Sequence, residues 1–177
     1  MDSGRRSSYD PEFRVDDALL DRAPGPIGSG VEDDPRLVVE TLLGIRQGAA
    51  WRVFLLRRTP SRGGFWQGVS GRVEPNDESL RDAALREIRE ETGIGAGVVV
   101  FDLGRWIEYS GRTGIRYRKR ILGAVLPKDA SIETVRLSEE HDRAEIVTFD
   151  EARRRAPWSE AAEEFTALEA ALALRSA

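Results

Sequence analysis

Runs of apolar and β-branched residues, separated by turn residues, predict a series of strands along most of the chain. Two such runs flank the turn residues at 47–48, which predicts a pair of adjoining strands. A glycine-bearing loop at 111–114 predicts a hairpin between two later strands. The predicted strands cover residues 37–43, 51–56, 98–103, 106–109, 117–126 and 145–149.

Helical periodicity is strongest in the middle of the chain and at its end. Residues 78–92 consist largely of good helix formers, with Asp77 expected to cap the start and Gly93 placed for a left-handed C-terminal cap. A short helix is predicted at 150–155 and a longer one at 159–174. In the last helix, four apolar residues recur at helical spacing: Ala161, Phe165, Leu168 and Leu172. Strands around one central helix, with helices at the end, indicate an α/β fold.

The first 34 residues differ from the rest of the chain. They are polar and interrupted by prolines and glycines, which predicts a flexible N-terminal arm at 1–34 and one folded domain at 35–177. Residues 15–20 are the stretch of the arm that could pack, for instance across a homodimer interface, although the composition favours disorder.

Composition excludes several classes of protein. The chain has 177 residues, 40% hydrophobic and 33% charged, which is typical of one globular domain. No apolar run approaches the roughly 18 residues of a membrane span. With no cysteine and a single histidine, His141, the chain has no disulfide framework and no ordinary zinc cluster. Any metal is therefore expected to bind oxygen atoms.

The charge balance bears on partners and location. A formal net charge of −4 gives no electrostatic basis for binding a nucleic-acid polymer, and so favours a small ligand. The first residues contain no apolar segment of the kind found in a secretory signal, so a cytoplasmic protein is expected.

Three glutamates lie along one edge of the predicted central helix. At 100° per residue, Glu87, Glu90 and Glu91 share an arc that borders the apolar face. Carboxylates at such a border are half buried, and their pKa values rise unless a cation is present. Oxygen ligands favour Mg²⁺, with Mn²⁺ as the alternative, and Mg²⁺ commonly completes its shell with phosphate oxygens. The edge therefore indicates a metal and a polyphosphate ligand, although an ordinary solvated helix face remains the alternative.

The same region resembles the signature box of the Nudix hydrolases. The resemblance consists of residues 71–78, seven further residues, and then 86–94. One departure is that six residues separate Gly71 from Glu78, where the family has five. Taking Asp77 as the acidic residue would restore five but lengthen the next gap to eight, so an insertion at 76–77 is favoured.

The resemblance implies both a fold and a reaction. The fold would be a Nudix-type α/β/α sandwich with a mixed β-sheet and a catalytic loop-helix-loop. Residues 65–71 and 138–141 resemble the branch that acts on dihydroneopterin triphosphate and deoxynucleoside triphosphates. That branch implies Mg²⁺-dependent hydrolysis of a phosphoanhydride bond in a nucleoside or pterin triphosphate, which releases the monophosphate and pyrophosphate.

Matching positions imply roles for individual residues. Glu90 and Glu140 would serve in catalysis as water activators or general bases, and Arg86 would orient a glutamate of the box. Glu78 would be supportive. The implied metal ligands are Gly71, through its carbonyl, Glu87, Glu90, Glu91 and Glu140.

Candidate substrate contacts lie on the strands and loops. Arg58, at the end of a strand, is a candidate phosphate contact, and Trp66 and Tyr109 are candidates to stack on a base or pterin ring. His141 is expected to be structural. Three arginines alternate along one strand and are expected to form a solvated outer face: Arg116, Arg118 and Arg120.

Two other functions remain open. A hydrolase of dinucleoside polyphosphates or nucleotide sugars would keep the same metal chemistry, and Tyr109 gives a weak indication of the dinucleoside polyphosphate branch. A Nudix-like module that binds a nucleotide without turnover would be expected to lack box carboxylates, and this chain retains them.

Overall fold

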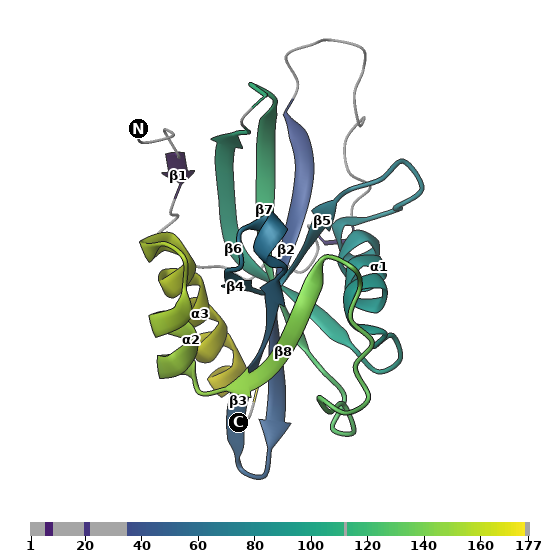
Figure 1. The fold of residues 1–177 in the computed structure, drawn as a ribbon, viewed down its shortest axis with the longest axis vertical. Helices are drawn as coiled ribbons and strands as arrows, with labels where there is room; N and C mark the ends of the chain where they lie inside the picture. Colours follow the sequence, from purple (N-terminus) through teal and green to yellow (C-terminus); the bar gives the residue numbers. More distant parts are fainter. Residues whose placement is uncertain (1–5, 9–19, 22–34, 112, 176–177) are drawn as a thin grey trace.

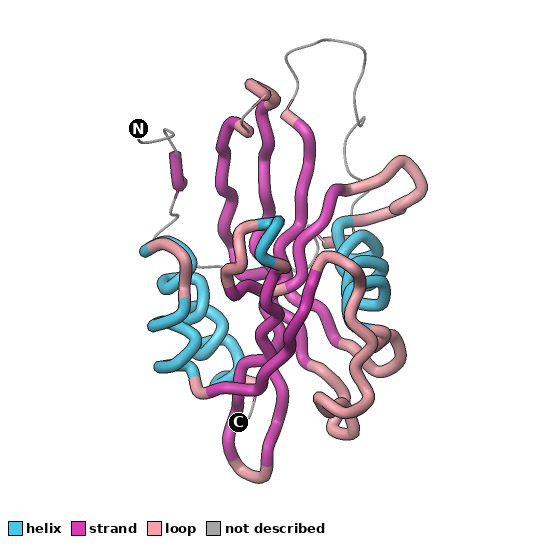
Figure 2. The backbone as a smooth tube through the Cα atoms, viewed as in Figure 1, coloured by secondary structure: helices cyan, strands magenta, loops and turns pink. Residues whose placement is uncertain are grey.

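A mixed β-sheet lies between one helix on one face and two helices on the other, which makes the fold an α/β/α sandwich, as predicted (Figure 1). The computed structural model describes residues 6–8, 20–21, 35–111 and 113–175. Figure 2 shows the strands as one continuous layer that separates α1 from the α2–α3 pair.

The elements follow one another along the chain in the predicted order. The strands are β1 (Arg6–Ser8), β2 (Arg36–Gln47), β3 (Ala50–Arg58), β4 (Trp66–Gln67), β5 (Val69–Arg72), β6 (Val99–Ser110), β7 (Arg116–Val125) and β8 (His141–Val147). The helices are α1 (Leu80–Thr92), α2 (Phe149–Arg155) and α3 (Ser159–Leu174), with a short 3₁₀ turn at Pro60–Arg62. None of the described helices is long and apolar enough to cross a membrane.

The sheet has the order β1-β6-β7-β2-β3-β4, with β5 paired to β2 and β8 paired to β3. The β2–β7 pair is parallel and the other pairs are antiparallel. Side chains alternate between the two faces, so Val39 and Leu43 of β2 pack in the core beneath α1, while Leu42 packs in the core beneath α2 and α3. Each face of the sheet is thus covered by its own hydrophobic core.

Several predicted boundaries were wrong. The strands predicted at 98–103 and 106–109 form one strand, β6, because a register shift between Asp102 and Arg105 lets pairing with β7 continue through the break. Strand β8 begins and ends earlier than predicted, and Phe149 is the first residue of α2. No strand was predicted between residues 57 and 77, but this stretch contributes β4 and β5, which pair with β3 and β2.

Two described pieces of the predicted N-terminal arm belong to the packed structure. Strand β1 pairs with β6, and Leu20 is fully buried in the core beneath α1. The Arg81 backbone N–H donates to the Leu20 carbonyl at 3.3 Å, and the Arg81 side chain pairs with Asp21 at 2.7 Å. The prediction of a free arm did not include these contacts. Most of the predicted segment 15–20 lies outside the described residues.

Candidate metal and phosphate site

Helix α1 carries the predicted acidic edge. Ser79 caps its start, where the Ser79 hydroxyl accepts a hydrogen bond from the Asp82 backbone N–H at 3.1 Å, and Gly93 ends it at a φ of 75°. The prediction that Asp77 caps the helix was wrong. The buried face of α1, which includes Ala84 and Ile88, fixes the helix against the sheet and so fixes the direction of its glutamates.

Glu91 is the most deeply buried carboxylate of this edge, at 4% exposure. Its Oε2 atom is buried and has no hydrogen-bond partner among the described residues. Burial, together with the negative charges of Glu87 and Glu140, raises the pKa of the Glu91 carboxyl to about 8, although Arg58 and the Ser70 backbone oppose the shift. A buried carboxylate without a partner is costly, and a bound cation would remove that cost.

Glu87 lies directly against the backbone of Gly71. A Cβ atom added to Gly71 would stand 1.8 Å from the carboxyl carbon of Glu87, so no other residue fits here without displacing the glutamate. Burial is the main reason that the pKa of Glu87 is raised, and Arg86, whose Nη1 donates to Glu87 Oε1 at 2.7 Å, opposes the shift. Strand β5 and helix α1 therefore bring the Gly71 backbone and the Glu87 carboxylate together, as the predicted metal ligands require.

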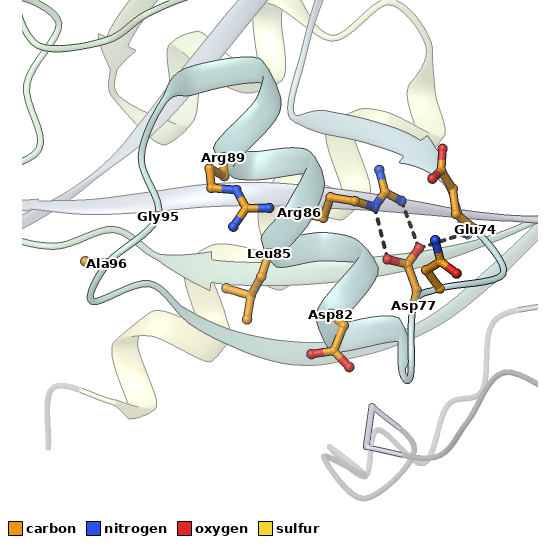
Figure 3. Close-up of a pocket in the computed structure, with 9 residues that line it drawn as sticks. Glu74, Asp77, Asp82, Leu85, Arg86, Arg89, Gly95 and Ala96 are labelled. Atoms are coloured by element: carbon orange, nitrogen blue, oxygen red, sulfur yellow. Dashed lines mark hydrogen bonds and ion pairs between the residues drawn. The ribbon is translucent and has the colours of Figure 1, made fainter.

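Arg86 is bound by a residue that the sequence analysis did not select. Its guanidinium donates two hydrogen bonds to Asp77, at 3.0 and 2.8 Å (Figure 3). It also donates one to the Arg72 carbonyl at 2.9 Å. Burial opposes the shift, but Arg86 lowers the pKa of Asp77. The hydrogen bonds that Arg86 donates to Asp77 are the main cause of the raised pKa of Arg86. Glu78 is exposed. Asp77, not Glu78, therefore supports the arginine, which places the extra residue after Asp77 instead of before it.

Glu90 and Glu140 occupy more open positions. The Glu90 side chain is 54% exposed, and its Oε2 lies 3.4 Å from Arg86 Nη1. The Glu140 carboxylate accepts from Arg58 at 2.6 Å and pairs with Arg62 at 3.2 Å. Arg58 thus lies beside Glu140, and its contact with phosphate stays a prediction. Arg62 was missed, and its position in the Pro60–Arg62 turn beside Arg58 is the sequence feature that could have revealed it.

His141 is buried at the first position of β8. Its Nδ1 lies 3.9 Å from Glu91 Oε2, too far for a hydrogen bond, and both atoms are buried without partners in the described part of the chain. Burial and the nearby charge of Arg58 lower the pKa of His141 to about 4, so the imidazole is neutral at physiological pH. A neutral imidazole cannot compensate the negative charge that Glu91 carries when its carboxyl group is ionised.

The oxygen atoms at this edge are of the chemical type that binds a divalent cation. Glu87 and Glu91 supply carboxylate oxygens at the border of the core, and Gly71 supplies a close backbone. Across the described ranges, however, no three acidic or histidine side chains converge closely enough to hold a metal ion in this arrangement. The reason is visible in the contacts, since Arg86 binds Glu87 and Glu90 while Arg58 and Arg62 bind Glu140. Metal binding would require Glu90 or Glu140 to exchange its guanidinium partners for the cation.

A pocket of about 160 Å³ opens beside Arg58. Tyr109 lines it and Trp66 does not, and ring stacking by Tyr109 stays a prediction. Side chains alternate along β4, so Phe65 and Gln67 line the pocket while Trp66 packs against the core beneath α2 and α3, where the guanidinium of Arg155 lies 5.0 Å from the centre of its ring. Phe65 and Trp158, which the sequence analysis did not select as stacking residues, supply the other aromatic side chains of the pocket: their ring centres are 5.6 Å apart.

Comparison with curated proteins gives relatives that match part of the chain. An octanoyltransferase of Myxococcus xanthus is 39% identical over 113 residues, which are 63% of this chain and 30% of that protein. The CTP pyrophosphohydrolase of Escherichia coli is 44% identical over 61 residues, which are 33% of this chain and 44% of that protein. The chain thus spans less than half the length of either relative.

Solved structures share the fold over a longer range. The dihydroneopterin triphosphate pyrophosphohydrolase of E. coli superposes with a TM-score of 0.62 at 20% identity, over 77% of this chain and 98% of that structure. The sequence model of the NUDIX domain matches residues 39–168, which contain the Gly71 loop, helix α1 and Glu140. The chain therefore belongs to the NUDIX domain family.

Proposed function

We propose that the chain hydrolyses a phosphoanhydride bond of a nucleoside or pterin triphosphate with Mg²⁺, or Mn²⁺ in its place, and releases the monophosphate and pyrophosphate. The observation that carries this proposal is the buried, unpartnered Oε2 of Glu91 beside the Glu87 carboxylate. The name of the E. coli relative, a CTP pyrophosphohydrolase, supports a nucleoside triphosphate substrate.

The metal ligands in this proposal are Glu87 and Glu91, together with the Gly71 carbonyl and one of the more exposed carboxylates, Glu90 or Glu140. Bound there, a divalent cation would neutralise phosphate charge and lower the pKa of an attacking water. Arg86 positions Glu87 through the hydrogen bond of 2.7 Å, and Asp77 holds Arg86 in turn.

Arg58 and Arg62 bind the polyphosphate in this mechanism. Guanidinium groups bind phosphate oxygens well, so an arriving polyphosphate competes with Glu140 for both arginines. Glu140, once released, is free to accept a proton from the attacking water or to complete the metal shell. Glu90 is the other candidate base, because its side chain is exposed and water can reach it.

A panel of substrates tests the proposal. The panel contains the common nucleoside triphosphates, dihydroneopterin triphosphate, diadenosine tetraphosphate and a nucleotide sugar, each with Mg²⁺ or with chelator, and pyrophosphate and phosphate release are measured. Mass spectrometry of products formed in ¹⁸O-labelled water locates the attacked phosphorus. We expect Mg²⁺-dependent release of pyrophosphate from a triphosphate. If only diadenosine tetraphosphate or the nucleotide sugar is hydrolysed, that compound would take the place of the triphosphate as the proposed substrate. Binding without turnover would make the chain a nucleotide-binding module.

Two matched substitutions test the metal site. Glu91→Gln keeps the shape of the side chain and removes its charge, so we expect turnover to fall by about a hundredfold or more, since metal catalysis supplies several kcal/mol of transition-state stabilisation. Glu78→Gln makes the same change at an exposed position just before α1 and is expected to leave turnover unchanged. Equal rates for wild type and Glu91→Gln would overturn the metal assignment.

A further inference from the structure

Three polar side chains are buried in the wall of the pocket beside Arg58. Glu40, Gln67 and Lys119 all line this pocket and are only 6%, 8% and 9% exposed. Glu40 comes from β2 and Lys119 from the neighbouring strand β7, and their side chains form an ion pair through Glu40 Oε2. A buried ion pair is seldom worth more to stability than well-packed apolar residues, so a pair that lines a pocket is a candidate for ligand recognition.

The pair retains hydrogen-bonding capacity for a ligand. Lys119 has three N–H donors and uses one on Glu40, whose carboxylate has two oxygens, each able to accept more than one hydrogen bond. Although burial opposes the charge, Glu40 and Glu164 raise the pKa of Lys119, so the lysine stays protonated and can only donate. A ligand that satisfies both side chains must present an acceptor to Lys119 and donors to Glu40.

The ring edges of common substrates differ in this pattern. Guanine and pterin both present a carbonyl oxygen, a ring N–H and an amino group in a row, which offers one acceptor and two adjoining donors. Cytosine has one donor group beside two acceptors, uracil has one N–H between two carbonyls, and adenine has no carbonyl. Among these rings, only the edge shared by guanine and pterin offers a donor to each oxygen of Glu40. The carbonyl oxygen of the same edge accepts from Lys119.

The rest of the pocket fits a flat ring that is joined to phosphates. Phe65, Tyr109 and Trp158 line it and provide aromatic surfaces for a planar ring. Arg58 also lines the pocket, and the same guanidinium donates to Glu140 and bears on the charge of Glu91. One ligand can therefore place its ring by Lys119 and its phosphates by Arg58.

We propose that Glu40 and Lys119 read the amino-and-carbonyl ring edge shared by guanine and pterin, so that the substrate class is a guanine nucleoside triphosphate or a pterin triphosphate. This inference rests on the proposed function, because it names the ring that the same site accepts. Glu40 accepts from the ring N–H and the amino group, and Lys119 donates to the carbonyl.

The comparison of dGTP with dITP tests the inference most simply, because dITP lacks only the amino group. We expect kcat/KM for dGTP to exceed that for dITP by about tenfold to a hundredfold, the range of one well-placed donor–acceptor pair. Dihydroneopterin triphosphate, measured beside dGTP, decides which of the two rings is preferred. Equal rates with dGTP and dITP, or faster turnover of CTP, would overturn the ring assignment while leaving hydrolysis intact.

Two matched variants locate the discrimination. Glu40→Gln replaces one acceptor oxygen by an amide donor, so the ratio of dGTP to dITP turnover is expected to fall towards one. Glu164→Gln is the control: Glu164 is the other carboxylate that acts on Lys119, but it does not line the pocket, and the ratio should keep its wild-type value. Thermal melting shows whether each variant is folded, and if Glu40→Gln does not fold, the wild-type ratio alone decides.

Binding measurements separate this inference from the proposed function. If no triphosphate is hydrolysed, the proposed function is wrong, and calorimetry with dGMP and dIMP still tests the pocket. Tighter binding of dGMP by about tenfold would support the ring assignment, and equal binding of the two would contradict it.

Discussion

Asp102 and Glu91 are both buried carboxylates, at 0% and 4% exposure, but only Asp102 is bound by a guanidinium. Arg120 donates to Asp102 through Nε at 2.8 Å and through Nη2, and the Gly104 backbone N–H donates to it at 3.0 Å. Glu91 Oε2 has no such partner among the described residues, and burial raises the pKa of this carboxyl to about 8.

The difference separates a buried carboxylate that the fold neutralises from one that it leaves without a hydrogen-bond partner. Strands β6 and β7 supply both members of the Asp102–Arg120 pair, so the fold itself neutralises the carboxylate. Helix α1 brings Glu91 beside Glu87, and no described residue forms a hydrogen bond with Glu91 Oε2. In an interior where uncompensated charge is costly, the second arrangement indicates a site for a cation.

The largest expected effect is that substitution of Asp102 lowers stability, whereas substitution of Glu91 lowers turnover and leaves stability unchanged. Asp102→Asn leaves Arg120 with a weakened partner in the core, and breaking such a buried pair costs about 3–5 kcal/mol in the free energy of unfolding. Glu91→Gln removes a charge that is unpartnered, so the metal-free protein should unfold no more easily than wild type. Chemical denaturation gives the free energy of unfolding of each variant, and turnover is measured on the folded fraction. Loss of stability in Glu91→Gln equal to that in Asp102→Asn would show that Glu91 is structural.

A substitution at Gly71 tests how closely the backbone and Glu87 approach. Gly71→Ala would place a Cβ 1.8 Å from the Glu87 carboxyl carbon, so the glutamate must move away from the site. We expect turnover to fall by about tenfold to a hundredfold, which is typical for displacement of a ligand or its support. Gly95→Ala is the control, because its Cβ would meet only the Arg89 side chain at 3.5 Å. Normal turnover in Gly71→Ala would contradict the placement of Glu87 at the metal.

Asp77 and Glu78 give a smaller and sharper comparison. Asp77→Asn weakens the hold on Arg86 and should lower kcat by about tenfold with little change in KM, because Arg86 positions Glu87 without contacting substrate. Asp77→Glu keeps the charge and should restore part of the loss. Glu78→Gln should match wild type. A loss at Glu78 with none at Asp77 would return the supporting role to the residue chosen from sequence.

Metal affinity should depend on pH through Glu91. The raised pKa means that this carboxyl is largely protonated at neutral pH without metal, whereas a cation binds the carboxylate, so binding releases a proton. Affinity for Mg²⁺ should therefore rise towards pH 8 and level off above it, and calorimetry in buffers of different ionisation enthalpy measures the proton. The metal-free protein should also lose stability as the pH rises from about 4.5 to about 8, since the folded state favours the protonated form. Both effects should be smaller in Glu91→Gln, where the raised pKa values of Glu87 and Glu164 remain.

The part of the site that lies on one helix could be predicted from sequence, because helical spacing alone places Glu87, Glu90 and Glu91 on one edge. The contacts between different helices and strands could not be predicted from the sequence. Alternation placed Arg118 and Arg120 on the same face of a strand, and this face was expected to be solvated. Arg120 is instead buried against Asp102, because β6 continues alongside β7 and brings the aspartate next to the arginine. Spacing favoured Glu78 over Asp77, and only the packing of the loop against Arg86 shows the reverse.

The residues that line the pocket beside Arg58 could not all be predicted from the sequence either. Trp66 was chosen because it is large and lies in a recognised segment, but the two residues of β4 face opposite ways and Gln67 lines the pocket in its place. Trp158, on a distant segment, reaches Phe65 only in the folded chain. Residues that lie far apart in sequence and meet across the sheet give no periodic signal.

Anomalous scattering from a crystal of the wild-type protein soaked with Mn²⁺ tests the cation site most directly. The expected result is a peak bordered by the carboxylates of Glu87 and Glu91 and the carbonyl of Gly71. A peak elsewhere on the protein, or no peak at a Mn²⁺ concentration that supports turnover, would contradict the assignment of Glu91 as a metal ligand.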